Sequence, residues 1–390
     1  MKQIDMKQAE LTDLAKKGRI SRRDFMAKAT AMGVTAALAT SVWNNSAQAA
    51  PKRGGTMRFG SGHGSTTDTL DPGTFANGGI IHQGYGMRNH LTEVNNDGTL
   101  IPELSEGWEA SDDASEWVFN LRKGVEFHNG KSLEPQDVID SINHHRGKDS
   151  KSAAKPLLAA ITELKADGKD KVVFKLSGGN ADFPFTVSDY HLAIMPSKGN
   201  GKVDWQSGIG TGAYVKQKFE PGVRATYKRN PNYFKSGRGN FDEVEFLTIG
   251  DVVARTNALT TGEIDAMNRA DLKTVHLLAR RKGIKVEEVT GTLHYTIPMH
   301  TDTAPFDDNH VRLALKFAVD REALLKIILK GHGVVGNDHP ISTANRYHNN
   351  KLPQRKYDLD KAKFHLKKAG LSSLSVDLSA ADAAFVGAVD

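Results

Sequence analysis

Residues 117–128 read Trp-Val-Phe-Asn-Leu-Arg-Lys-Gly-Val-Glu-Phe-His. In the first half of this stretch Trp117, Phe119 and Leu121 occupy every second position, which is the period of a β-strand with one buried face. The same period recurs in residues 172–176, where Val, Phe and Leu alternate with other residues. The pattern predicts two strands whose large side chains lie in a hydrophobic core.

Further strands and helices are predicted on both sides of this stretch. The strands cover residues 56–59, 214–219, 224–228 and 244–249, and turns rich in Gly, Pro, Asp and Asn separate them. Apolar residues at helical spacing predict a helix over residues 135–145 and a short one over residues 255–261. This part of the chain therefore has mixed α/β character.

The pattern changes near residue 300. Helical spacing and capping residues predict helices over residues 309–319, from Asp320 to Gly331 and from Asp358 to Gly370. A last strand is predicted over residues 374–378. We therefore expect a second α/β domain, of which this sequence contains only the N-terminal part.

The composition excludes several classes of protein. The chain of 390 residues has no cysteine, which excludes disulfides, cysteine-ligated zinc, iron–sulfur clusters and thiol nucleophiles. Its net charge is +6, but residues 1–49 carry most of that excess. Because the remainder is nearly neutral, we expect no nucleic-acid partner.

Residues 1–49 have the three parts of an export signal. Arg22 and Arg23 precede a mildly apolar run over residues 27–42, and Ala47-Gln48-Ala49 offers a small-residue cleavage site. The paired arginines are typical of twin-arginine (Tat) signals; the other interpretation is a basic amphipathic helix. We expect the Tat export machinery to deliver the protein to the periplasm, where the mature chain is soluble.

A series of short motifs then follows in the order seen in one family. They include Gly54-Gly55-Thr56, Pro102-Glu103-Leu104, residues 117–128, Gly210-Thr211-Gly212-Ala213-Tyr214 and Ala318-Val319-Asp320-Arg321. Over nearly all of residues 53–372 the chain resembles the large peptide-type solute-binding proteins of ABC importers. That family includes oligopeptide-, dipeptide- and nickel-binding proteins. The sequence departs from its pattern at Ala213, where family members usually have proline.

The resemblance implies a fold class. It is an α/β, two-lobed periplasmic-binding-protein fold of the class II-like, large peptide-binding type, with mixed sheets and a hinge between the lobes. Lobe I, with its extra subdomain, is expected at residues 50–290, and the N-terminal part of lobe II at residues 291–390. Family members continue beyond this point, so the second lobe is expected to be truncated in this sequence.

The resemblance also implies a function in transport. A small peptide or peptide-like solute binds between the lobes, favours their closure, and is delivered to the membrane permease subunits of an ABC importer. We expect a monomer with no cofactor, no metal and no catalytic residues. Alternatives on the same scaffold are a nickel or other metal chelate, an oligosaccharide or an opine-like solute. A periplasmic enzyme and a sensor subunit remain alternatives from other classes.

Three segments are expected to carry the ligand-binding residues. One is the polar turn after the first strand, because polar loops at strand ends commonly carry binding groups. The resemblance adds a stretch near the cleft and the start of a strand that enters the second lobe. The candidates are His63, Ser65, Thr66, Thr67, Asp189, Tyr190, His191, His294 and Tyr295. Each segment also has a purely structural alternative. The turn could be a solvated connector, His191 a histidine hydrogen-bonded within the fold, and His294 and Tyr295 part of a packed strand face.

The fifteen histidines do not form a metal-site pattern. His144 and His145 are adjacent, so on a helix they point in different directions, and pairs such as His294 and His300 lack the i, i+4 spacing of helical metal ligands. We therefore expect these histidines to be solvated. Capture of a metal chelate in the cleft between the lobes is kept as an alternative. Signatures of serine hydrolases, phosphate-binding loops and dinucleotide-binding loops are absent from the sequence.

Overall fold

A computed structural model describes residues 11, 12, 14, 22–32, 34, 39, 52–289, 291, 293–343 and 345–379. The chain divides into two compact units, the first ending at Arg269 and the second beginning at Ala270. Each unit is described by itself. The predicted lobe boundary near residue 290 stays a prediction.

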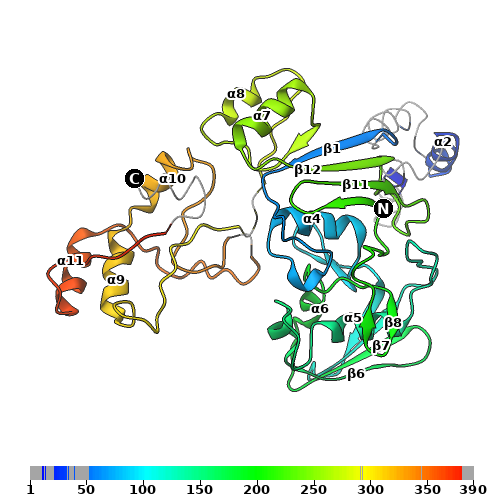
Figure 1. Cartoon of the computed structure of the whole chain (residues 1–390), viewed down its shortest axis with the longest axis horizontal. Coiled ribbons are helices and arrows are strands. Elements are labelled where there is room, and N and C mark those ends of the chain that lie inside the picture. The colour runs from blue at the N-terminus through cyan, green and yellow to red at the C-terminus, as the bar shows by residue number, and fades with distance from the viewer. Residues whose placement is uncertain are drawn as a thin grey trace. The chain divides into compact units, whose positions relative to one another are not determined.

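A five-stranded mixed sheet forms one part of unit 1, in the order β10-β11-β12-β1-β13. Its strands are β1 (Thr56–Ser61), β10 (Tyr214–Glu220), β11 (Arg224–Arg229), β12 (Glu243–Thr248) and β13 (Ala266–Met267). Strand β1, between β12 and β13, is parallel to both of them, whereas β11 is antiparallel to its neighbours. Figure 1 shows β1, β12 and β11 side by side. Leu70, Met87, Ala225, Tyr227 and Phe246 form the core on this sheet.

A four-stranded antiparallel sheet, in the order β4-β5-β7-β6, forms the other part of unit 1. Its strands are β4 (Ser105–Ala110), β5 (Glu116–Leu121), β6 (Ile161–Ala166) and β7 (Lys171–Leu176). Trp117, Phe119 and Leu121 are buried on β5, as the alternation predicted. Phe119 and Phe174 meet edge to face, with ring centroids 5.4 Å apart. These aromatic contacts fix the register of two strands that are distant in sequence.

Shorter elements complete unit 1. The helices are α4 (Gly78–Met87), α5 (Pro135–His144), α6 (Phe183–Thr186) and α7 (Val252–Thr261), with 3₁₀ turns at Pro72–Thr74 and Lys155–Leu158. Two small antiparallel pairs are β2 (Thr92–Val94) with β3 (Leu100–Pro102), and β8 (Ser197–Gly199) with β9 (Lys202–Val203). Helix α7 begins three residues before the predicted start, because the Asp251 side chain caps it by accepting from the Ala254 N–H at 2.7 Å.

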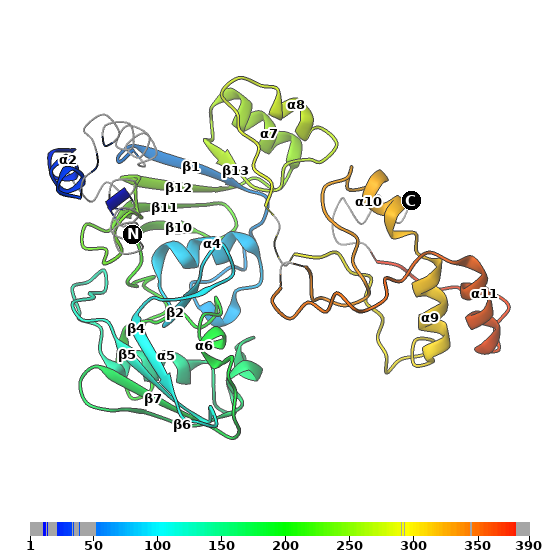
Figure 2. The same ribbon diagram turned by 180° about the vertical axis from the view of Figure 1, so that it is seen from behind.

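Helix α4 lies between the two sheets of unit 1, as both views show (Figures 1 and 2). The Asn77 side chain caps it by accepting from the N–H groups of Gly79 and Ile80. Its glycines permit close approach: a methyl group at Gly79 would lie 2.2 Å from the carbonyl oxygen of His63. The start of α4 therefore packs directly on the backbone of the polar turn that follows β1.

The described part of unit 2 contains helices α8 (Val275–Ala279), α9 (Asn309–Ala318), α10 (Arg321–Ile327) and α11 (Leu359–Lys368). Helices α9 and α11 pack together, and the rings of Phe317 and His365 stack with centroids 5.7 Å apart. The predicted strand at residues 374–378 is wrong, because this segment is not a strand and Val376 and Leu378 are exposed. A strand needs a neighbour to share its hydrogen bonds, and the described residues of unit 2 contain no strand.

The N-terminal segment is described only in part. Helix α2 (Arg22–Ala31) contains the paired arginines, and its Phe25 and Ala29 are buried against Leu11 and Ala39. The predicted cleavage site at Ala47-Gln48-Ala49 lies outside the described residues. Among the residues that the structure describes, no helix has the length and apolar character needed to span a bilayer.

Two glycines of α4 make a matched test of this packing. We expect Gly79→Ala to destabilise the protein by about 1–3 kcal/mol, because the new methyl group overlaps the backbone of His63. Gly86→Ala, where no atom lies within 4 Å of the added carbon, should stabilise α4 by about 0.5–1 kcal/mol. Urea unfolding of both variants measures the difference, and equal effects would contradict the packing described.

Candidate functional site

The candidate site is built at one edge of the five-stranded sheet. Strands β1, β12 and β13 run parallel, so their carboxyl ends, Ser61, Thr248 and Met267, lie at the same edge. Open α/β sheets commonly bind ligands outside this edge. The buried Ser61 hydroxyl donates to the His63 carbonyl at 2.8 Å, and the Gly62 N–H donates to Asn268 Oδ1 at 2.9 Å. The turn that carries His63 therefore starts from a fixed position.

Hydrogen bonds within the turn over residues 63–69 hold its shape. Asp68 accepts from the N–H of Ser65 at 2.8 Å, and the hydroxyls of Ser65 and Thr67 are 2.7 Å apart. Asn77, which caps α4, donates from its side chain to Asp68 at 2.7 Å. Thr66 and Thr67 are exposed. The turn is thus preorganised against α4 and presents small polar side chains to solvent.

The second predicted segment is held by His191, which is buried. Its Nδ1 lies 2.7 Å from Asp189 Oδ1 and its Nε2 lies 3.1 Å from the carbonyl oxygen of Phe75. Both partners are acceptors, and the Tyr190 ring packs on the imidazole with centroids 4.0 Å apart. Burial would raise the pKa of Asp189, but hydrogen bonds from His191 and its charge outweigh burial and lower it. His191 therefore orients Asp189 and Tyr190 from inside unit 1.

The structure brings two of the three predicted segments to the same part of unit 1. His63 contacts Gly79 at the start of α4, and His191 bonds to Phe75 just before that helix. The third segment, with His294 and Tyr295, belongs to unit 2. The strand predicted to begin at these two residues is wrong: residues 293–300 form no strand and both side chains are exposed.

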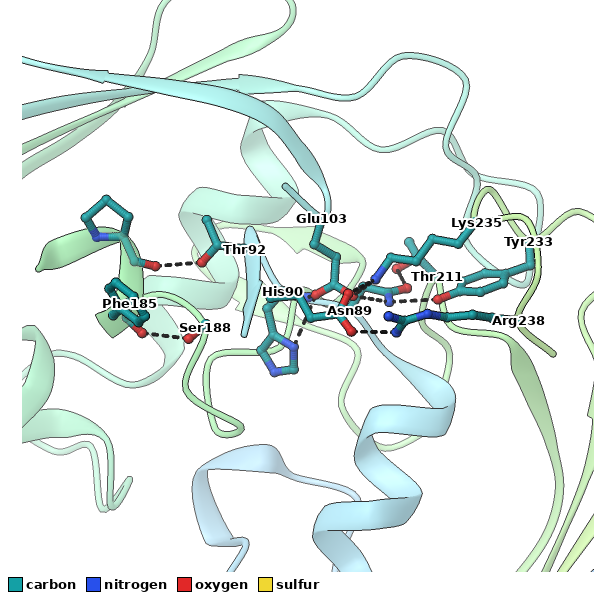
Figure 3. Close-up of polar contacts among 12 residues, drawn as sticks. Asn89, His90, Thr92, Glu103, Phe185, Ser188, Thr211, Tyr233, Lys235 and Arg238 are labelled. Atoms are coloured by element: carbon teal, nitrogen blue, oxygen red, sulfur yellow. Dashed lines mark hydrogen bonds and ion pairs between the residues drawn. The ribbon is translucent and has the colours of Figure 1, made fainter. Parts of the chain in front are cut away.

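A buried polar network next to this region was not singled out from the sequence. Glu103 is 4% exposed, accepts from Asn89 and from the His90 N–H at 2.7 Å each, and pairs with Lys235 (Figure 3). Burial alone would raise the pKa of Glu103, but the His90 ring and the Lys235 ammonium lower it to about 2. Glu93 pairs with Lys235 at 2.6 Å and with Arg238 at 2.5 Å. The network fixes Asn89 and His90 directly after α4.

Sequence reasoning also missed Tyr85 of α4, which is 51% exposed. Its ring lies 5.4 Å from that of His90. Burial of the hydroxyl, followed by the negative charges of Asp189 and Glu103, raises the pKa of Tyr85 to about 12. No one-dimensional signal marks these residues, because only the fold brings Tyr85, His90 and Asp189 together.

The histidines of α5 take structural positions. His144 Nε2 lies 2.9 Å from Asp71 Oδ1, and His145 Nδ1 lies 2.7 Å from the Ser152 hydroxyl. Burial, with a smaller contribution from His144, lowers the pKa of His145 to about 3. Within the part of the chain that the structure describes, no group of three or more His, Asp or Glu residues is arranged to hold a metal ion.

Comparison with known proteins points to one family. Residues 99–379 match the family described as bacterial extracellular solute-binding proteins, family 5 middle. A dipeptide-binding protein of Escherichia coli (strain K12) is 29% identical to this chain over 306 residues. The alignment covers 72% of this chain and 57% of that relative. The chain therefore spans little more than half the length of that relative.

Solved structures show the same fold. The periplasmic binding protein DppA from Helicobacter pylori, in complex with the peptide STSA, has a TM-score of 0.70 at 23% identity, covering 82% of this chain and 67% of that one. NikZ from Campylobacter jejuni, in complex with Ni(L-His), has a TM-score of 0.71 at 21% identity, covering 80% and 63%. These likenesses confirm the predicted two-lobed α/β periplasmic-binding-protein class.

The buried His145 predicts sensitivity to acid. The neutral ring is favoured in the folded protein, so its contribution to stability is complete above the ordinary histidine pKa and is lost as the pH falls toward about 3. We expect roughly 3 kcal/mol to be lost from this group between pH 7 and pH 4. Urea unfolding of His145→Gln should show a shallower acid loss than wild type. The exposed His276→Gln serves as the control, and equal slopes for all three proteins would contradict the prediction.

Proposed function

Because the chain belongs to the bacterial extracellular solute-binding proteins of family 5, we propose that it captures a peptide or peptide-like solute and delivers it to an ABC importer. The observation that carries this proposal is the match over residues 99–379 together with the similarity to a dipeptide-binding protein. The partners are then the permease subunits of the importer, and the protein acts as a monomer.

The geometry of unit 1 supports solute capture. The proposed ligand-binding groups are His63, Ser65, Thr66 and Thr67 of the preorganised turn at the carboxyl edge of the sheet. Asp189 and Tyr190, which His191 orients, are proposed to join them. Hydroxyls, imidazole and carboxylate offer the donors and acceptors that a peptide backbone requires. His294 and Tyr295 are proposed to contribute from lobe II.

Capture and delivery need no bond to be made or broken, so the proposed role is binding rather than catalysis. The solute has to make contacts in the closed state that it lacks in the open one, since only this difference can shift the equilibrium between them. A micromolar dissociation constant corresponds to about −8 kcal/mol. Hydrogen bonds and packing against a short peptide are sufficient for this.

A metal chelate is the second candidate solute, and the likeness to NikZ favours it. In that case the histidines would contact a chelated ion rather than form a closed metal site. An opine-like compound or an oligosaccharide would use the same edge of the sheet.

The N-terminal segment supports export to the periplasm by the Tat machinery. Arg22 and Arg23 are adjacent at the start of α2 and precede the apolar run. The segment before Ala50 is proposed to be removed on export, which would leave a mature protein free in the periplasm.

Thermal unfolding against a panel of solutes tests the proposed function. The protein is mixed with di- to pentapeptides, nickel with and without histidine, and short oligosaccharides. A solute at 100 times its dissociation constant should stabilise the protein by about 2.7 kcal/mol, which is a readable shift in Tm. A shift with peptides supports the proposal. A shift with nickel–histidine alone would replace the peptide by a chelate.

Export is tested by replacing both Arg22 and Arg23 with lysine. We expect the variant to stay in the cytoplasm of a double-membraned bacterium, whereas wild type reaches the periplasm with its first 49 residues removed. Cell fractionation and mass spectrometry of the N-terminus provide the measurement. Lys28→Arg, a charge-preserving change on the same helix, should export normally. Export of the double-lysine variant at the wild-type level would overturn the Tat assignment.

A further inference from the structure

Helix α11 of unit 2 has one packed side and one charged side. On the packed side Ala362 is buried, and His365 stacks on Phe317 of α9. Both ribbon views show α11 lying along α9 (Figures 1 and 2). The opposite side carries four exposed residues, Lys363, Phe364, Lys367 and Lys368. We call these four residues the lysine face.

The lysine face is one continuous patch. Residues three or four positions apart on a helix are neighbours, so Phe364 lies beside Lys367 and Lys368, and Lys363 lies beside Lys367. The Lys368 Nζ atom is 5.6 Å from the centre of the Phe364 ring, and Phe364 is 55% exposed. An exposed aromatic ring is therefore bordered by ammonium groups.

The positive charge of this face is not neutralised by neighbouring carboxylates. Residues 351–368 contain seven Lys and Arg residues but only two carboxylates, Asp358 and Asp360. Asp358 caps α11 and pairs with Lys361 at 2.8 Å. Within the part of the chain that the structure describes, no ion pair joins a carboxylate to the lysine face.

The needs of the helix itself explain only part of this arrangement. Basic residues in a last turn interact favourably with the helix dipole, which accounts for Lys367 and Lys368. It does not account for Lys363, in the middle of α11, or for the exposed Phe364. Tyr357 and Leu359, at the beginning of the helix, are each 47% exposed as well. Exposed apolar side chains and lysines are therefore combined along one helix.

The type of basic residue favours a lipid surface over a protein as the partner. Protein interfaces are enriched in arginine and depleted in lysine, and recognition of carboxylates favours the bidentate guanidinium of arginine. Helix α11 contains four lysines and no arginine. Lysines that border apolar side chains are typical of helices that lie on anionic bilayers.

We propose that the lysine face of α11 binds an anionic phospholipid surface. The ammonium groups of Lys363, Lys367 and Lys368 lie at lipid phosphates, and the Phe364 ring enters the headgroup region. The packed side of α11 stays on α9, so the helix does not leave the fold. Because a single ring inserts and the remaining attraction is electrostatic, binding is reversible and sensitive to salt. This inference goes beyond the proposed function, since it concerns where the protein docks and not what it captures.

Sedimentation with lipid vesicles tests the proposal. Vesicles of phosphatidylglycerol mixed with phosphatidylcholine are compared with vesicles of phosphatidylcholine alone. We expect the protein to partition at least about tenfold more strongly onto the anionic vesicles at about 0.1 M salt. This preference should be lost at about 1 M salt, where the screening length falls from about 10 Å to about 3 Å.

A triple variant locates the contact. It combines Lys363→Gln, Lys367→Gln and Lys368→Gln, all at exposed positions that the fold does not need. Each basic residue near an anionic surface strengthens partition by about fivefold, so we expect the triple variant to bind about a hundredfold more weakly.

A matched variant controls for net charge. Lys148→Gln, Lys151→Gln and Lys169→Gln remove the same charge from exposed positions of unit 1, and this variant should partition within about twofold of wild type. Every variant keeps residues 1–49, so the basic N-terminal helix contributes equally to all of them. Phe364→Trp gives a direct readout. Brominated lipids in the anionic vesicles should quench its fluorescence more than that of wild type.

The outcomes separate this inference from the proposed function. Equal partition of the two triple variants, or no preference of wild type for anionic vesicles, would overturn the lipid contact. Absence of extra quenching in Phe364→Trp would place the contact elsewhere and also overturn it. If the variant without the three lysines bound vesicles normally but imported less solute in cells, the face would belong to an acidic protein surface instead. None of these results bears on solute capture, which thermal unfolding with the solute panel tests separately.

Discussion

Unit 1 depends on one close contact between backbones. The turn Gly210-Thr211-Gly212 packs on the end of α4, where the Gly212 N–H donates to the Met87 carbonyl at 2.9 Å. A methyl group at Gly210 or Gly212 would lie 2.2–2.6 Å from backbone atoms of Gly86 and Met87. Only glycine permits this approach.

The same turn joins the two sheets. His128, which follows β5 in the four-stranded sheet, donates its N–H to the Gly210 carbonyl at 2.8 Å. Thr211 is fully buried and its hydroxyl donates to Asn89 at 2.9 Å, and the chain then enters β10 of the five-stranded sheet. Asn89 also donates to Glu103. The contact therefore positions the polar network and, through it, His90 beside the candidate site.

Local pattern was sufficient to predict elements that bury one regular face. Strands β5 and β7 and helices α5, α9 and α11 follow from periodicity and caps, because each has apolar residues at its own period. Helix α4 was not predicted. Its sequence GGIIHQGYGM contains four glycines, which oppose helix formation, so its stability comes from the Asn77 cap and from burial of Ile80 and Met87. The strand at residues 374–378 failed for the opposite reason, since alternation alone supplies no pairing partner.

The candidate site was predicted where it follows a strand end and missed where it depends on tertiary contact. His63 and its turn come directly after β1, and a polar turn at that place is a one-dimensional signal. His90 and Glu103 are distinguished by burial and by contacts that the sequence pattern does not show. Tyr85 is distinguished by its ring contact with His90. The network also explains how a carboxylate can be buried here: Glu103 is charged because Lys235, Asn89 and the His90 N–H compensate it. Removing Lys235 would leave the buried Glu103 carboxylate without this ion pair.

The residues that hold the candidate site in place differ from those proposed to contact the solute. The turn after β1 is fixed by Asp68 and Asn77, and the segment with Asp189 by His191 and the Phe75 carbonyl. The exposed side chains of Thr66, Thr67 and Tyr85 take no part in these hydrogen bonds. Thr67 contacts only the neighbouring Ser65 hydroxyl of the same turn. Under the proposed function, substitution of an exposed position would change which solute is favoured without disturbing the backbone that presents it. Under the proposed function, a scaffold of this kind would bind different solutes through changes in a few side chains, because its loops are already ordered in the folded protein.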